Sequence, residues 1–241
     1  MEKIIIKSKA DYQEFFNMLL ANSKHESVEN YAKHKAILNS PREVICLSMS
    51  FIRQVAKQIL AGEPLEFLKF ANGETYEEVL ICGLVIAGLK DIEKQIELFD
   101  IWKEKIDNWS LCDSVCSSMK PLKKCKEKSK YFDYFYDMCF DEREYVSRFG
   151  IITIMVNFME EQYISQILKM AKTVSNDAYY VQMGIAWLLS VTFVYFREQT
   201  LELLKQKTLS KFIQNKTISK CHDSFRVSEA DKEMLKEFRI K

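Results

Sequence analysis

Apolar residues recur along the chain at the three- and four-residue spacing of amphipathic helices. Six glycines and three prolines are few for 241 residues, and turn-rich β architectures need more of both, so the pattern predicts an all-α protein. Ser228, followed three residues later by Asp231, is typical of a capped helix start. Short breaks in the pattern divide the chain into helices expected at 11–21, 26–35, 41–61, 63–72, 75–88, 90–105, 108–119, 122–138, 142–158, 160–173, 177–195, 197–205, 208–220 and 229–238.

Three segments resemble one another: YEEVLICGLVIAG, YVSRFGIITIMV and YYVQMGIAWLLSV each begin with Tyr and turn apolar around a glycine. The glycines of the last two segments, Gly150 and Gly184, stand 34 residues apart. A helical-pair repeat of this length indicates an α-solenoid, and HEAT-like pairs fit best because no TPR signature is present. We therefore expect a single HEAT-like domain over 1–241, with N-terminal helices in 1–40, repeats in 41–238, and a concave binding groove.

The charge balance argues against a generally basic nucleic-acid binder, because the formal net charge is only +1. A local basic run, MKPLKKCKEKSK, is either a solvated helix face or a contact surface for an anionic partner. The charge-free segment 178–196 could span a bilayer by length. Its polar residues favour a buried helix instead, so we expect no membrane association.

The seven cysteines are odd in number and show no CxxC spacing. The three histidines, His25, His34 and His222, are scattered and complete no zinc motif. This usage is typical of a reduced protein in a cytosolic compartment, and it predicts neither a disulfide framework nor a structural metal.

Repeat spacing brings four residues onto one predicted stripe. Asp113 plus 35 is Arg148, and Arg148 plus 35 is Met183. Trp109 lies four residues before Asp113 and Trp187 four after Met183, and an offset of four residues keeps the same helix face. One interpretation is packing, with both tryptophans in the core and an ion pair between repeats. The other is an aromatic cleft that attracts a flat cation, with a carboxylate and a phosphate-binding arginine beside it.

The segments IDNWSLCDSV, YVSRFGIITIMVNF and YYVQMGIAWLLSV closely resemble the AlkD family of DNA alkylation-repair glycosylases, over roughly residues 30–238. The resemblance implies a HEAT-like solenoid that holds duplex DNA and hydrolyses the N-glycosidic bond of N3- and N7-alkylpurines without metal or cofactor. It implies that Asp113 is the catalytic carboxylate, that Trp109 and Trp187 line the cleft, and that Arg148 contacts a phosphate. Further contacts to the DNA phosphates would come from four basic residues: Lys120, Lys216, Lys220 and Arg226.

The chain departs from the family pattern at Met49-Ser50, His222 and Phe225, where the family often has a Thr-Pro, a basic residue and a tyrosine. Two other functions therefore stay open: a DNA-structure binder without base excision, and a protein-interaction solenoid whose stripe is only structural. For the enzyme we expect a monomer in the cytoplasm, associated with a bacterial-type nucleoid when it is bound to DNA.

Overall fold

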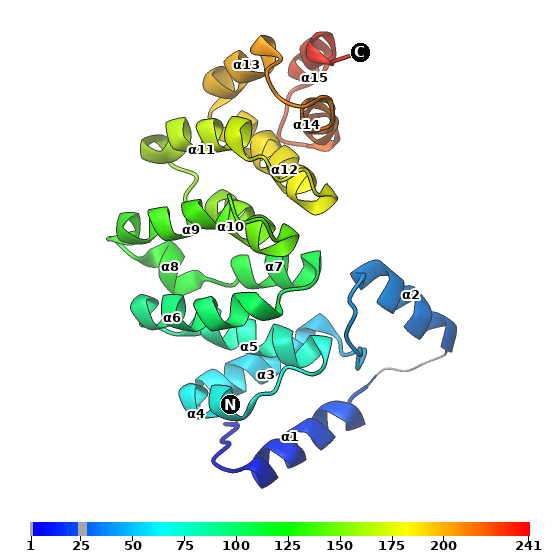
Figure 1. The fold of residues 1–241 in the computed structure, drawn as a ribbon, viewed down its shortest axis with the longest axis vertical. Helices are drawn as coiled ribbons and strands as arrows, with labels where there is room; N and C mark the ends of the chain where they lie inside the picture. The colour runs from blue at the N-terminus through cyan, green and yellow to red at the C-terminus, as the bar shows by residue number, and fades with distance from the viewer. Residues whose placement is uncertain (1, 24–27) are drawn as a thin grey trace. The chain divides into compact units, whose positions relative to one another are not determined.

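A computed structural model describes residues 2–23 and 28–241, and it is built from helices (Figure 1). Over these residues it has no β-strand, only an isolated parallel bridge between Glu43 and Thr75. The all-α prediction is confirmed. His25 and residues 26–27 of the expected second helix lie outside the described residues. The chain divides into two compact units, Met1–Cys125 (unit 1) and Lys126–Lys241 (unit 2), which are described separately.

The core of unit 1 surrounds the helix α5, which is buried along almost its whole length and packs against α3, α6, α7 and α8 (Figure 1). A reciprocal capping box fixes the start of α5: the Thr75 hydroxyl accepts from the Glu78 N–H, and the Glu78 carboxylate accepts from the Thr75 N–H. The helices of unit 1 are α1 Lys9–Ala21, α2 Val28–Leu38, α3 Met49–Leu60, α4 Pro64–Phe70, α5 Tyr76–Gly88, α6 Ile92–Trp102, the short 3₁₀ helix η1 Lys103–Lys105, α7 Trp109–Cys116 and α8 Lys120–Lys124.

The expected helix over 41–61 is wrong in its first third, because α3 begins only at Met49, with Ser48 as its cap. The reason is a buried carboxylate from elsewhere in the chain. Glu77 is fully buried and accepts the backbone N–H groups of Ile45, Cys46 and Leu47 at 2.8, 2.8 and 3.2 Å. These bonds replace the helical ones and hold Cys46 at a positive φ of 65°.

Helices α10 and α12 form the core of unit 2; α10 packs on α9 and α12, and α12 packs on α10, α11, α13 and α14. The single helix expected over 122–138 is wrong, since α8, η2 and α9 occupy this region. Ser228 caps α15 as predicted. The helices of unit 2 are η2 Lys128–Tyr131, α9 Phe132–Met138, α10 Glu144–Asn157, α11 Glu161–Thr173, α12 Tyr179–Tyr195, α13 Arg197–Gln206, α14 Lys211–Asp223, α15 Glu229–Leu235 and η3 Lys236–Phe238.

Alternate helices contact one another within each unit: α3, α5 and α7 in unit 1, and α10, α12 and α14 in unit 2. The glycines noted in the sequence serve close helix packing at two of three positions. A Cβ on Gly150 would lie 2.7 Å from the backbone nitrogen of Cys139 at the end of α9, and one on Gly83 would lie 2.5 Å from the Trp102 ring. A Cβ on Gly184 would meet nothing closer than 3.5 Å, so close packing does not require glycine there.

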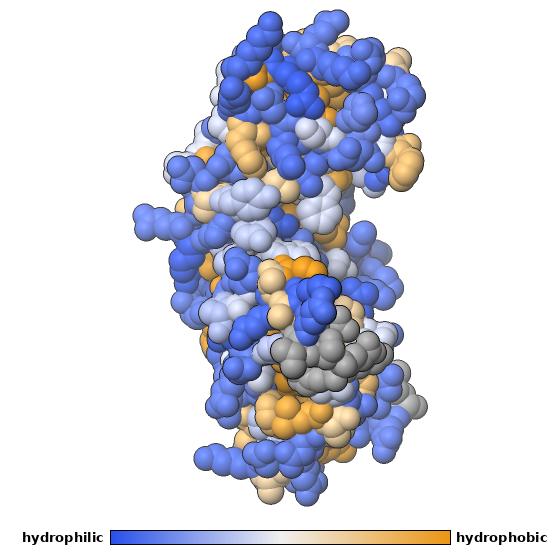
Figure 2. Space-filling view, turned by 90° about the vertical axis from the view of Figure 1, so that its right-hand side faces the viewer, coloured by the Kyte–Doolittle hydropathy of each residue, from blue (hydrophilic) through white to orange (hydrophobic). Residues whose placement is uncertain are grey.

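The charge-free segment forms α12, which has 17 residues. None of the helices in the described part of the chain is long and apolar enough to cross a membrane. On the face drawn in Figure 2, hydrophilic residues cover most of the surface and hydrophobic residues form smaller areas between them. All seven cysteines are free thiols, and every one except Cys125 is buried.

Candidate functional site

The helix that carries Trp109 and Asp113 begins at a strongly fixed cap. The Asn108 side chain is fully buried and accepts the N–H groups of Ser110 and Leu111 at 2.9 and 3.2 Å. In the first turn of this helix, α7, the Ser110 hydroxyl shares a 2.8 Å hydrogen bond with the Tyr76 hydroxyl of α5. Burial raises the pKa of Tyr76 to about 12, so this phenol stays neutral and the bond persists across the physiological range.

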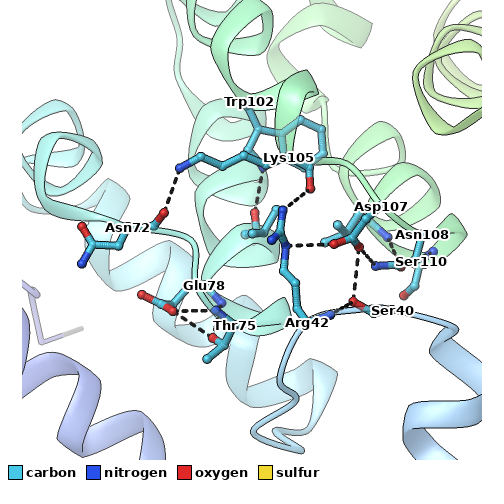
Figure 3. A network of polar contacts seen from close by, with 12 residues as sticks. Ser40, Arg42, Asn72, Thr75, Glu78, Trp102, Lys105, Asp107, Asn108 and Ser110 are labelled. Carbon is cyan, nitrogen blue, oxygen red and sulfur yellow. Dashed lines mark hydrogen bonds and ion pairs between the residues drawn. The ribbon is translucent and has the colours of Figure 1, made fainter. Parts of the chain in front are cut away.

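An ion pair holds the residues just before this cap (Figure 3). Arg42 Nε lies 2.9 Å from Asp107 Oδ2, and Arg42 Nη2 donates to the Lys105 carbonyl at 3.0 Å. Asp107 also accepts from the Ser40 hydroxyl at 3.3 Å and from the Asn108 amide at 2.7 Å. The loop before α3 therefore determines where α7 begins, and with it the position of Trp109 and Asp113.

Helix α7 buries one face and leaves the other partly exposed. Leu111, Cys112 and Val115 are fully buried, whereas Trp109 and Asp113 are half-buried and share the opposite face. The Trp109 indole N–H donates to the Ile37 carbonyl of α2 at 3.1 Å, which fixes the direction of the ring. The burial of Cys112 agrees with its predicted packing role rather than with a metal or nucleophilic one. The predicted carboxylate and indole thus lie together in unit 1.

The side chain of Arg148 is mostly buried, unlike that of a typical surface cation. It lies on α10, is only 6% exposed, and donates from Nη1 to the Tyr180 carbonyl in the first turn of α12 at 2.8 Å. Its guanidinium carbon lies 5.9 Å from the centre of the Tyr180 ring. Arg148 therefore ties α10 to α12.

Trp187 lies on α12 and is 36% exposed, so this indole is not a core residue. The Lys220 ammonium of α14 lies 5.8 Å from the centre of its ring. This distance is within the range of cation–π attraction, so the indole already presents its face to a positive charge. The structure brings two predicted residues, Trp187 and Lys220, together in unit 2.

The remaining predicted DNA contacts vary in exposure. Lys120 and Arg226 are exposed, and Lys216 is half-buried on α14. Arg226 stacks on Tyr195, with its guanidinium carbon 4.6 Å from the ring centre. At the departures from the family pattern, Phe225 and His222 are both exposed.

Sequence reasoning missed two aromatic residues that the basic side chains contact, Tyr180 and Tyr195. The position of Tyr195 could have drawn attention, because it lies eight residues beyond Trp187 and so two turns along the same helix. Tyr180 lies one helical turn before Gly184 on α12, where a Cβ would lie 3.6 Å from Arg148 Nη1. A search of the described residues for metal-binding groups of His, Cys, Asp or Glu finds none.

The comparisons with known proteins bear on the family of the chain and not on the roles of single residues. The family model described as "DNA alkylation repair enzyme" matches residues 15–208, a range that contains Trp109, Asp113, Arg148 and Trp187. Lys216, Lys220 and Arg226 lie beyond the matched range. Neither a search of curated proteins nor a search of solved structures gives a significant match. Because the match covers most of the chain, the protein belongs to the DNA alkylation repair enzyme family.

Proposed function

We propose that the protein is a monofunctional DNA glycosylase that removes cationic N3- and N7-alkylpurines from duplex DNA. The observation that carries the proposal is the pairing of Trp109 and Asp113 on the partly exposed face of α7, in a chain whose family is one of alkylation repair. An indole face attracts the cationic base, and a carboxylate beside it stabilises positive charge on the sugar.

The proposed reaction is hydrolysis at C1′ of the damaged nucleotide. The C1′–N bond breaks and its electron pair leaves with the base, which thereby loses its positive charge. The sugar becomes oxocarbenium-like, and the Asp113 carboxylate stabilises it and orients a water molecule. Water adds to C1′ and releases a proton, which leaves an abasic site and a free alkylpurine. No lysine stands at the stripe positions 109, 113, 148, 183 or 187, so Schiff-base lyase chemistry is not expected.

In this proposal Trp187 contributes a second indole and Arg148 a phosphate contact. The exposure of Trp187 supports its role, because a ligand can reach the ring. Arg148 is only 6% exposed, so a phosphate would have to approach α10 and α12 closely to contact its guanidinium. Lys120, Lys216, Lys220 and Arg226 would add contacts to neighbouring phosphates, and these would supply most of the affinity.

We also propose that the helices stack as a HEAT-like solenoid over the whole chain. The alternate-helix contacts within each unit support this arrangement, as do the similar segments around Gly83, Gly150 and Gly184. Action on chromosomal DNA would place the enzyme in the cytoplasm, and a monomer would suffice for the reaction.

The proposal is tested by incubating the protein with methylated duplex DNA and measuring free 7-methylguanine and 3-methyladenine. We expect release of both bases and abasic sites in the DNA. Binding without release would replace the enzyme by the non-catalytic DNA binder. Failure to bind DNA at low salt would leave the protein-interaction scaffold, although the family match to a repair enzyme argues against that outcome.

A further inference from the structure

Unit 1 contains a basic cleft, and Lys120 is the single residue of its lining that the proposed function uses. A hollow of about 910 Å³ lies where the C-terminal half of α3, the end of α5, the start of α6 and the turn from α7 to α8 meet. This size is within the range of ligand pockets in proteins. Five cations line it: Arg53, Lys57, Lys90, Lys120 and Lys124. Among the described residues that line it there is no carboxylate.

The cations of the cleft lie close enough in sequence to repel one another. Arg53 and Lys57 stand four residues apart on α3, and Lys120 and Lys124 stand four apart on α8. Like charges at this spacing repel one another and destabilise a helix. No described carboxylate forms an ion pair with any of the five.

Other lysines of the same unit are paired. Lys69 binds Glu66 and Lys103 binds Asp100, each at 2.6 Å. Lys7 binds Glu63 at 3.0 Å, close to the same end of α3. The five charges of the cleft are therefore concentrated and uncompensated, which favours an anionic partner.

The floor of the cleft is apolar. It is formed by Ala56, Leu60, Leu84, Gly88, Ile92 and Pro121. Gly88 has a steric role in this floor, because a Cβ there would lie 2.3 Å from Leu60 Cδ1. On α3, Arg53, Ala56, Lys57 and Leu60 follow the i, i+3, i+4, i+7 spacing of one helix face that combines charge and apolar surface.

We propose that this cleft docks an acidic peptide segment of a partner protein, with an apolar side chain in the floor and carboxylates on the rim. An apolar anchor surrounded by a charged rim is the usual anatomy of a small protein interface. The phosphates of duplex DNA could form ion pairs with the cations. The sugar–phosphate exterior of DNA, however, has no apolar group suited to the floor. The combination of floor and rim is what favours a peptide.

The probe for this proposal is a labelled peptide that alternates Asp pairs with Leu, titrated with the full-length protein at low ionic strength. We expect saturable binding that weakens about tenfold or more in the double variant Lys57→Glu/Lys124→Glu, since two rim attractions become repulsions. The matched control is Lys3→Glu/Lys9→Glu, which reverses two exposed cations outside the cleft and should leave the affinity unchanged. Circular dichroism establishes that both variants retain their helices.

A second peptide with Ser in place of Leu tests the floor without altering the protein. We expect clearly weaker binding, because the apolar contribution is lost. Equal affinity of the two peptides, or of wild type and the cleft variant, would overturn the proposal. So would absence of peptide binding together with loss of duplex DNA binding in the cleft variant, which would make the cleft a phosphate contact. These measurements use no base excision, so they are independent of the glycosylase proposal.

Discussion

The residue pair Trp109 and Asp113 lies on a short helix that contacts from outside the helix hold in place. Helix α7 has only eight residues, and a helix of that length is marginal without outside support. Its cap Asn108, the Asp107–Arg42 ion pair and the Tyr76–Ser110 hydrogen bond supply that support. The exposed face can then carry an indole and a carboxylate whose positions are determined by packing on the other face.

Ionic ties of individual residues also hold the C-terminal helices together. Arg197, at the start of α13, donates to Asp231 of α15 at 3.0 Å from Nε, and the Ser228 hydroxyl donates to the same carboxyl at 2.9 Å. The Arg197 guanidinium is the largest cause that holds the pKa of Asp231 below its ordinary value of 3.8. Because the folded pKa is depressed, the stabilisation is complete above the ordinary pKa and is lost as the pH falls through the folded value.

We therefore expect Asp231→Asn to lower the free energy of unfolding near neutral pH by up to about 1 kcal/mol, since Arg197 is partly exposed. Below the folded pKa of Asp231 the difference from wild type should vanish. Urea unfolding of both proteins across the acid range measures this convergence. A difference that stays constant down to the lowest pH would mean that the ion pair contributes nothing to stability.

At the scale of helices, the hydrophobic pattern was sufficient to predict the helices that contain Gly83, Gly150 and Gly184. Their apolar residues follow a helical period, and their ends carry turn signals. It failed over 41–48, where Pro41 resembled a helix start. The determinant of that stretch is Glu77, about thirty residues later in the chain, whose carboxylate binds three backbone N–H groups. A tertiary contact of this kind leaves no local pattern to detect.

The repeat glycines Gly150 and Gly184 differ in the space beside them, so substitution by alanine should change stability differently at the two positions. Gly150→Ala would press a methyl group onto the backbone of the segment that ends α9, with contacts of 2.7–2.9 Å, and should destabilise by about 1–3 kcal/mol. Gly184→Ala meets only ordinary contacts from 3.5 Å, so the better helix propensity of alanine should leave stability unchanged or raise it by up to about 1 kcal/mol. Denaturant midpoints of the two variants measure the contrast. Equal destabilisation by both would contradict the packing difference.

At the scale of the molecule, the sequence was enough to propose residues for the candidate site but not to predict their surroundings. Spacing alone selected Asp113, Trp109, Arg148 and Trp187, because a repeat period relates distant residues without a structure. The same reasoning could not predict that Arg148 is buried against Tyr180, since burial depends on how α10 and α12 pack. The basic cleft was missed for a related reason: its residues come from four helices, α3, α5, α6 and α8, and from the turns beside them, so no single stretch carries its pattern.

Binding to DNA should depend on salt through the lysines of α14. Each phosphate that a lysine neutralises releases counterions, so Lys216→Ala and Lys220→Ala should each reduce the slope of log K against log salt by about 1. Titrations of duplex DNA at several salt concentrations give this slope. Lys172→Ala, at an exposed position on α11, is the matched control and should retain the wild-type slope. If the slope is unchanged in the α14 variants, these lysines do not contact phosphates.

The central claim, that Asp113 performs base excision, is tested most directly by single-turnover release of 7-methylguanine with enzyme in excess. Asp113→Asn keeps the size of the side chain and removes its charge, so we predict a rate lower by about 100-fold or more. Binding to the same duplex should stay within a few-fold of wild type. Ser114→Ala, one position along α7 and also half-buried, should excise at the wild-type rate. Excision by Asp113→Asn at the wild-type rate would contradict the account.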